Sequence, residues 1–370
     1  MGAKVHEYFI FFVTLYMALR ALFFKKTFVF AFKARTSRGA MPDKQSWFIK
    51  IWDEASPEIY GIGEAGPLPG LSVDPLEEMD LQMEMLVKKI MEGNFDSIEA
   101  IDSASLVSIE FPSIRLALEM ALLDLKNDGK RILFNNSFSK GQPLPINGLI
   151  WMGGMDFMME QINRKVEQGF TCIKIKVGGL NFERECDVLA YIRNKYYEKD
   201  ITIRLDANGA FKPEEALKKL EILSKYSIHS IEQPIKPRQA EMAELCKQSP
   251  ISIALDEELI GINDSMEKEA LLKRIQPQYI ILKPTLHGGF KGCDEWIEIA
   301  NALNIGWWIT SALESNIGLN AVCQFTAQYN VTLPQGLGTG MLYENNFDSP
   351  LEVKGENIFY NVEKQWEIKD

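Results

Sequence analysis

From residue 144 onward, short apolar runs alternate with amphipathic stretches at intervals of about 24 to 30 residues. One strand, one connection and one helix require about that length. The candidate strands are residues 144–151, 172–177, 201–207, 227–233, 251–257, 279–284, 306–312 and, more weakly, 332–337. Eight strands separated by helical segments predict an α/β fold, a (β/α)7β TIM-like barrel over residues 131–345, rather than an open sheet.

The part of the chain before the barrel, residues 17–130, predicts a separate α+β domain. Its β-like runs and helical stretches are residues 23–34, 46–52, 75–93 and 112–127. The two β-like runs are expected to form a hairpin-like unit, in which the polar segment 34–45 is a mobile, basic connecting loop. Residues 61–74 are rich in Gly and Pro and predict a second loop. Beyond the barrel we expect a C-terminal tail, residues 346–370.

Residues 1–16 precede the first domain and contain an apolar run from Tyr8 to Tyr16. The run is too short to span a bilayer by itself, Arg20 follows it closely, and no clear small-residue cleavage site is present. We interpret residues 1–16 as an extension upstream of a domain that begins near Met17. A membrane anchor or signal segment and an ordinary strand are the alternatives that the sequence leaves open.

Charge and cysteine usage narrow the class of protein. The formal net charge of -11 argues against binding to nucleic acid or to acidic membrane surfaces. The five cysteines lie far apart and form no CxxC pair, which indicates reduced thiols in a cytoplasmic protein. With only three histidines in the chain, a lysine or a carboxylate is the favoured general base. Whether the protein forms a homo-oligomer is left open.

The strand at residues 172–177, CIKIKV, carries two lysines. Side chains alternate along a strand, so Lys174 and Lys176 share one face while Ile173 and Ile175 share the other. A solvated strand tolerates such a pair, and edge strands use lysine in this way. The alternative is a functional site, which requires carboxylates at the ends of the neighbouring strands.

Charged residues occupy the ends of five consecutive candidate strands: Lys176, Asp206, Glu232, Asp256 and Lys283. In a barrel these ends meet at the face where active sites are built. Three converging carboxylates would repel one another and lose hydration, so we expect a divalent cation between them. Oxygen ligands suit Mg²⁺, for which Mn²⁺ can substitute. A metal-bound carboxylate can lose its α-proton to a nearby amine, which predicts proton transfer on a small-molecule carboxylate.

Five segments in this order, KIKVGG, RLDANGAF, IEQPI, ALDEEL and ILKPT, resemble the muconate-lactonizing branch of the enolase superfamily. The resemblance implies that Asp206, Glu232 and Asp256 bind Mg²⁺. It also implies that Lys176 is the acid/base catalyst and that Lys283 faces it from the other side of the site.

The same resemblance extends over the chain apart from residues 1–16. It implies that the α+β domain caps the barrel and that the C-terminal tail returns to the cap. The loops around Thr36–Met41 and Gly61–Ser72 are then expected to close over the substrate.

Further segments, among them TSRG, GEAGPLPG, LKPTLHGG and SALESNIGL, resemble the dehydratases of this branch that form o-succinylbenzoate in menaquinone biosynthesis. The implied reaction is syn-elimination of water from a 2-succinyl-6-hydroxy-cyclohexadiene-1-carboxylate. N-acylamino acid racemases share both lysines and are the alternative, together with other racemases, epimerases or cycloisomerases of the superfamily. The mandelate-racemase branch is disfavoured, because residues 306–315 contain no histidine.

Four residues are candidates for substrate contacts: Lys174, Arg204, Asn208 and Ser311. Lys174 points into the same space as Lys176, and Arg204 shares a strand face with Asp206. For Arg204 an ion pair inside the barrel is the alternative. Asn208 and Ser311 are polar residues at the starts of loops.

Overall fold

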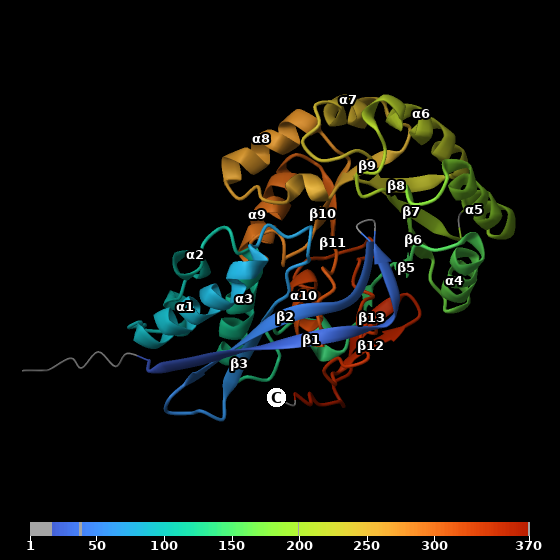
Figure 1. The fold of residues 1–370 in the computed structure, drawn as a ribbon. Coiled ribbons are helices and arrows are strands. Elements are labelled where there is room, and N and C mark those ends of the chain that lie inside the picture. The colour runs from blue at the N-terminus through green and yellow to red at the C-terminus, as the bar shows by residue number, and fades with distance from the viewer. Residues whose placement is uncertain (1–16, 37–38, 199, 369–370) are drawn as a thin grey trace, which may run out of the picture.

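The computed structural model describes residues 17–36, 39–198 and 200–368 (Figure 1). The alternatives for residues 1–16 therefore concern a segment outside the described residues. In the described part of the chain, no helix has the length and apolarity that crossing a membrane requires.

The first domain is an antiparallel three-stranded sheet, in the order β1-β2-β3, with helices packed against it. Its elements are β1 (Leu19–Thr36), β2 (Gly39–Asp53), β3 (Tyr60–Ala65), α1 (Met79–Glu92), α2 (Ser103–Leu106) and α3 (Pro112–Lys126). Helix α3 begins with Pro112. Proline suits this position because an N–H group in the first turn of a helix would have no partner within the helix. Its apolar residues, Ile114 and Leu118 among them, are buried against the sheet.

The predicted hairpin-like unit is confirmed, but the extent of its connecting loop, residues 34–45, is wrong. Strands β1 and β2 continue as a hairpin, with Ala34 opposite Met41 and Thr36 opposite Gly39. The register shifts between Val29 and Ala34. Polar composition alone suggested a loop, but antiparallel pairing satisfies the backbone groups of both segments.

The second domain is a curled parallel sheet in the order β11-β10-β9-β8-β7-β6-β5, with helices around its outside (Figure 1). The strands are β5 (Gly148–Ile150), β6 (Cys172–Lys176), β7 (Thr202–Asp206), β8 (Ile228–Glu232), β9 (Ser252–Leu255), β10 (Tyr279–Leu282) and β11 (Gly306–Ile309). The helices are α4 (Met155–Glu167), α5 (Phe182–Lys195), α6 (Pro213–Leu223), α7 (Glu241–Gln248), α8 (Ser265–Ile275), α9 (Gly289–Ala302) and α10 (Asn316–Thr326). The predicted TIM-like barrel with an α+β cap is confirmed.

The two ends of this sheet meet through the weak eighth segment. Gln335 forms a parallel bridge with Ile146, just before β5, and Gly336 forms one with Thr310, just after β11. The first candidate strand, 144–151, is divided in the structure. Its beginning, β4 (Leu144–Pro145), pairs with a C-terminal strand, and only β5 joins the barrel.

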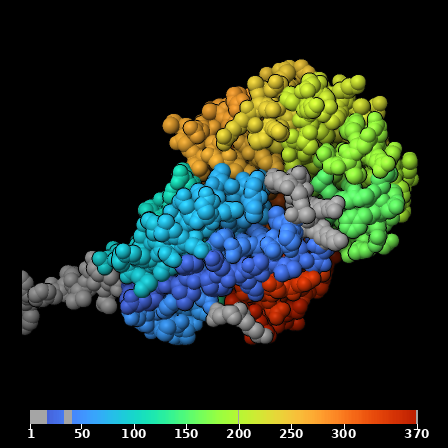
Figure 2. Space-filling model, viewed as in Figure 1, coloured from blue at the N-terminus to red at the C-terminus, as the bar shows by residue number. Residues whose placement is uncertain are grey.

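The C-terminal part of the chain contacts both domains. The Leu342 carbonyl accepts from the Ala31 N–H of β1, and the Glu344 N–H donates to the Val29 carbonyl. The hairpin of β12 (Leu351–Lys354) and β13 (Asn357–Tyr360) pairs instead with β4. In Figure 2 this C-terminal part, in red, packs beside the blue N-terminal strands.

Candidate active site

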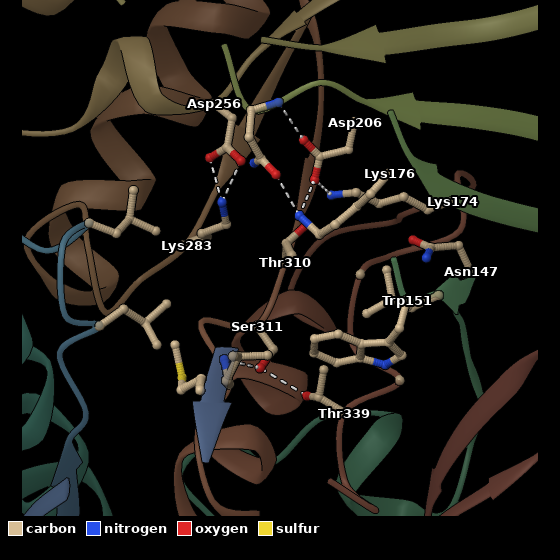
Figure 3. A pocket seen from close by; sticks show the side chains of 18 of the residues that line it. Asn147, Trp151, Lys174, Lys176, Asp206, Asp256, Lys283, Thr310, Ser311 and Thr339 are labelled. Carbon is tan, nitrogen blue, oxygen red and sulfur yellow. Dashed lines mark hydrogen bonds and ion pairs between the residues drawn. The ribbon is translucent and has the colours of Figure 1, made fainter. Parts of the chain in front are cut away.

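The parallel register of three neighbouring strands brings the predicted residues into one layer. Lys176 of β6 lies opposite Asp206 of β7, and Asp206 lies opposite Glu232 of β8. Asp256 directly follows β9, and Lys283 directly follows β10. Because all these strands are parallel, the five residues lie at the carboxyl-terminal face of the barrel. Figure 3 shows four of them, Lys176, Asp206, Asp256 and Lys283, around one pocket.

The lysines and carboxylates pair with one another. The Nζ atom of Lys174 lies 2.9 Å from Asp206 Oδ2 and also contacts Glu232. Lys176 Nζ lies 3.0 Å from the same Asp206 oxygen and donates to Asn208 Oδ1 at 2.6 Å. Figure 3 shows these lysines with Asp206 on one side and Lys283 with Asp256 on the other. Lys283 Nζ is 2.5 Å from both Asp256 oxygens.

Burial and charge oppose each other at these groups. Burial favours the neutral form of Lys174, but the carboxylates of Asp206 and Glu232 outweigh it and raise the lysine pKa. Burial likewise opposes the ionisation of Asp206, yet Lys174 and Lys176 lower its pKa. Burial raises the pKa of Glu232, and the neighbouring carboxylates of Asp206 and Asp256 raise it further. Lys174 offsets only part of this rise. The positive charge around Glu232 is therefore too small to offset the effect of burial on its carboxylate.

The carboxylates fit a further cation. Glu232 is fully buried, and its Oε1 atom has no hydrogen-bond partner among the described residues. Asp206 and Asp256 are almost completely buried as well. Within residues 17–36, 39–198 and 200–368, no group of three acidic, histidine or cysteine side chains is arranged to hold a metal ion. Lys174 and Lys283 lie against Asp206 and Asp256 instead. The unpartnered oxygen of Glu232 is nevertheless the type of donor atom that Mg²⁺ prefers.

A cavity of about 110 Å³ opens onto Asp206 and Asp256, while the predicted ligand Glu232 is buried behind its wall and does not line it. Its wall contains Lys174, Lys176, Asp206, Asn208, Asp256, Lys283 and Ser311, which the sequence predicted. It also contains Asn147, Trp151 and Thr339, which the sequence analysis did not single out. Trp151 ends the first candidate barrel strand, so its position at a strand end was an available signal.

The cap supplies an apolar part of the wall. Leu68 and Leu71 come from the segment Gly61–Ser72, and Met41 comes from β2. These three residues cluster with Ala312 and Leu313 from the connection between β11 and α10. Both cap segments that were expected to face the substrate thus contribute to the cavity wall.

Arg204 does not line this cavity. It is 1 % exposed, donates to the Pro334 carbonyl at 2.6 Å and stacks on the Trp308 ring at 4.0 Å. Arg204 precedes Asp206 by two positions on β7, so it lies on the same face of the strand, one layer deeper inside the barrel. This position argues against the substrate contact predicted for Arg204.

Asn208 and Ser311 both lie at the cavity, and each is held by a neighbour. Asn208 accepts from Lys176 and donates to Glu257 at 3.0 Å, so it orients the lysine amine. Ser311 Oγ donates to Glu314 at 2.6 Å and accepts from Thr339 at 2.9 Å. Leu313, which follows closely, has a φ of +61°, a conformation that costs a residue with a side chain about 1–2 kcal/mol.

The backbone that carries Lys283 is also fixed. Its N–H donates to Nδ1 of His287 at 3.0 Å, and His287 is 3 % exposed. Burial, together with the charge of Lys283, lowers the pKa of His287 to about 3, so this ring is neutral. His287 is thus a structural acceptor that holds the strand end in place.

A parallel barrel with carboxylates and lysines at its strand ends, covered by an α+β cap, is the architecture of the enolase superfamily. The chain belongs to this superfamily, because residues 158–361 match the family described as enolase C-terminal domain-like. Within it the chain falls among the o-succinylbenzoate synthases. It is 45% identical over 353 residues to o-succinylbenzoate synthase of Desulfotalea psychrophila, covering 88% of this chain and 95% of that protein.

Solved structures agree with this assignment. The crystal structure of MenC from Desulfotalea psychrophila superposes with a TM-score of 0.82 at 40% identity, over 92% of this chain and 99% of that one. A dipeptide epimerase from Enterococcus faecalis, complexed with Mg and the dipeptide L-Leu-L-Tyr, superposes with a TM-score of 0.80 over 93% and 97%. At 21% identity the epimerase shows the shared fold alone.

Proposed function

We propose that this protein is a Mg²⁺-dependent dehydratase that forms o-succinylbenzoate from 2-succinyl-6-hydroxy-cyclohexadiene-1-carboxylate. The observation that carries the proposal is the placement of Lys176 and Lys283 on two sides of one cavity, beside buried carboxylates. The 45% identity to an o-succinylbenzoate synthase supports the choice of substrate. We further propose that the reaction belongs to menaquinone biosynthesis in the cytoplasm.

Lys176 is the proposed acid/base catalyst. Its amine is held between Asp206 and Asn208, so its position in the cavity is defined before the substrate binds. The neutral amine removes the α-proton of the substrate carboxylate and then protonates the departing hydroxyl group, which releases water. Lys283 carries positive charge on the other side of the cavity and stabilises the enolate that forms between the two steps.

Asp206, Glu232 and Asp256 are the residues that would hold Mg²⁺. When bound, the ion supplies a Lewis acid for the carboxylate of the enolate, as it does generally in enolase-superfamily enzymes. Lys174 contacts two of these carboxylates, those of Asp206 and Glu232, and its positive charge favours their ionised forms. The apolar cap residues Leu68 and Leu71 exclude water from the substrate ring.

The experiment is a turnover assay with the purified protein and magnesium, in which conversion to o-succinylbenzoate is followed by chromatography. Lys176→Ala should lower kcat by about 10²- to 10⁴-fold, since it removes the acid/base group. Lys273→Ala is the matched control, because Lys273 is an exposed lysine paired with Glu269 on the surface of α8. Turnover by Lys176→Ala at the rate of the control would exclude the assigned role, and turnover after exhaustive EDTA treatment would exclude the metal.

Racemisation of an N-acylamino acid is the second candidate. Lysines on two sides of one cavity can remove a proton from one face of a substrate and return it to the other. Incubation of one enantiomer of an N-succinylamino acid in D₂O tests this directly. Deuterium at the α-carbon with inversion would establish racemisation, whereas turnover of the cyclohexadiene alone would restrict the protein to dehydration.

A further inference from the structure

A buried lysine of the cap reaches into the connection between β11 and α10. Lys44, on β2, is 2 % exposed, and its Nζ atom donates to the Leu313 carbonyl at 3.0 Å. The Tyr343 hydroxyl donates to the same carbonyl at 2.6 Å. The Leu313 carbonyl is therefore held from two directions, by the cap and by the segment that follows the barrel.

The charge of Lys44 is balanced by residues of both domains. Burial lowers the pKa of Lys44, while the carboxylates of Glu64 and Glu314 oppose this effect and favour the ammonium. Glu64, on β3, also accepts from the Ser315 N–H at 3.0 Å and from the Gly318 N–H at 3.0 Å. Buried charges of the cap thus pair with the start of α10.

Gly66 provides the space for this contact. A Cβ atom at Gly66 would lie 2.5 Å from Lys44 Nζ, closer than a non-bonded contact allows. The sequence motif GIGEAG therefore contributes both a counter-charge, Glu64, and the absence of a side chain beside the lysine. This gives the last glycine of the motif a role that the proposed catalysis does not use.

The connection that Lys44 contacts forms part of the cavity wall. Leu313 and Ser311 both line the cavity, and the Leu313 N–H donates to Ser311 Oγ at 3.0 Å. Ser311 lies with Thr339 across the cavity from Asp206 and Asp256 (Figure 3). Leu313 has a left-handed backbone, which an isolated leucine would leave. The hydrogen bonds that Lys44 and Tyr343 donate to the Leu313 carbonyl hold the backbone in this conformation. They thereby fix the directions of the Leu313 and Ser311 side chains.

We propose that Lys44 is a positioning residue that sets substrate specificity: by binding the Leu313 carbonyl, it places the Leu313 side chain against the ring of the substrate. This inference rests on the proposed function, because it assumes a cyclic, partly apolar substrate in the cavity. Leu313 clusters with Leu68, Leu71 and Met41, so it forms the barrel side of the apolar wall that the cap completes. The cap thereby determines the shape of a wall that belongs to the barrel.

Lys44→Met removes the charge and keeps the length of the side chain. We expect a rise in KM of roughly tenfold with kcat changed less than about twofold, because Lys44 contacts no reacting atom. Gly66→Ala should reproduce this change by displacing the lysine. Lys268→Met is the matched control, since Lys268 is also buried and donates to a backbone carbonyl, that of Gly292, away from the cavity wall. It should lower stability without raising KM.

A double-mutant cycle separates positioning from a general structural role. Glycine adopts a positive φ without strain, so Leu313→Gly removes the side chain but not the backbone conformation. If Lys44 acts through Leu313, Lys44→Met should not raise KM further in the Leu313→Gly background. Fold-increases in KM that multiply in the double variant, or an unchanged KM in Lys44→Met, would overturn the proposal.

A crystal structure of Lys44→Met keeps the inference testable if the wild-type protein fails to turn over the proposed substrate. In that case the proposed function is wrong, but the backbone conformation of residues 311–314 in the variant still shows whether Lys44 holds this connection in place. We expect Leu313 to leave the left-handed region in the variant. An unchanged connection would refute the positioning role, whatever the substrate is.

Discussion

Replacement of Lys174 by methionine is expected to destabilise the metal-free protein and to make its stability depend on magnesium. The Lys174 side chain is 9% exposed, and its Nζ lies 2.9 Å from a carboxylate oxygen of Asp206 and also contacts Glu232. At that distance and an effective dielectric constant of about 20, one pair contributes about 6 kcal/mol of Coulomb energy, much of it offset by desolvation. Loss of the cation leaves the buried Glu232 without its lysine partner and Asp206 with Lys176 alone. The free energy of unfolding should therefore fall by about 3–5 kcal/mol.

The measurement is urea unfolding followed by tryptophan fluorescence, once with EDTA and once with saturating magnesium chloride. In EDTA the unfolding midpoint of Lys174→Met should lie well below that of the wild type. Magnesium should return about 2.7 kcal/mol at a hundredfold excess over its Kd. At the same magnesium concentration this gain should exceed the gain of the wild type, because Lys174 no longer competes for Asp206 and Glu232 and the Kd for magnesium is therefore lower.

Arg131→Met is the control for the loss of a buried ion pair elsewhere. Arg131 pairs with Asp124, and their side chains are 7% and 0% exposed, but neither lines the cavity. This variant should lose stability equally with EDTA and with magnesium. The reasoning is refuted if Lys174→Met is as stable as the wild type in EDTA, or if magnesium affects it no more than it affects Arg131→Met.

Three further predictions follow from single residues. Burial raises the pKa of Glu119 from 4.5 to about 7, so the folded protein holds a proton that the unfolded chain releases, and stability should fall as pH rises through this interval. In urea unfolding, Glu119→Gln should make the free energy of unfolding depend less steeply on pH. Equal pH dependence in the variant and the wild type would contradict the assignment. Arg204→Met should leave KM within about twofold, because Arg204 contacts Pro334 and Trp308 rather than the cavity. A tenfold rise in the KM of Arg204→Met would instead support a substrate contact for Arg204. Trp151→Ala should raise KM by about 10- to 100-fold through lost apolar contact, and steady-state kinetics with an unchanged KM would exclude Trp151 from the binding wall.

The hairpin of the cap was predicted correctly, but the length of its connecting loop was not, for an identifiable reason. Residues 34–45 are polar, and polar composition is typical of loops, yet most of them pair as strands. Lys44 shows why the pattern misled, because a lysine in a polar run reads as exposed but is 2 % exposed here. Its burial depends on Glu64 and Glu314, which lie far from it in the sequence, and local composition contains no information about such partners.

The sequence by itself determined the barrel and most of the catalytic layer. The recurrence of strand and helix lengths predicts parallel strands, and parallel strands bring their ends to one face, so Lys176, Asp206 and Lys283 follow from position alone. Only the tertiary structure decided which side chains of the next layer down touch the cavity. Arg204 and Lys174 lie opposite each other in that layer, yet Lys174 lines the cavity and Arg204 stacks on Trp308. Alternation fixes the face of a strand on which a side chain lies, but which side chains of one layer reach the cavity depends on packing between strands that are distant in the chain.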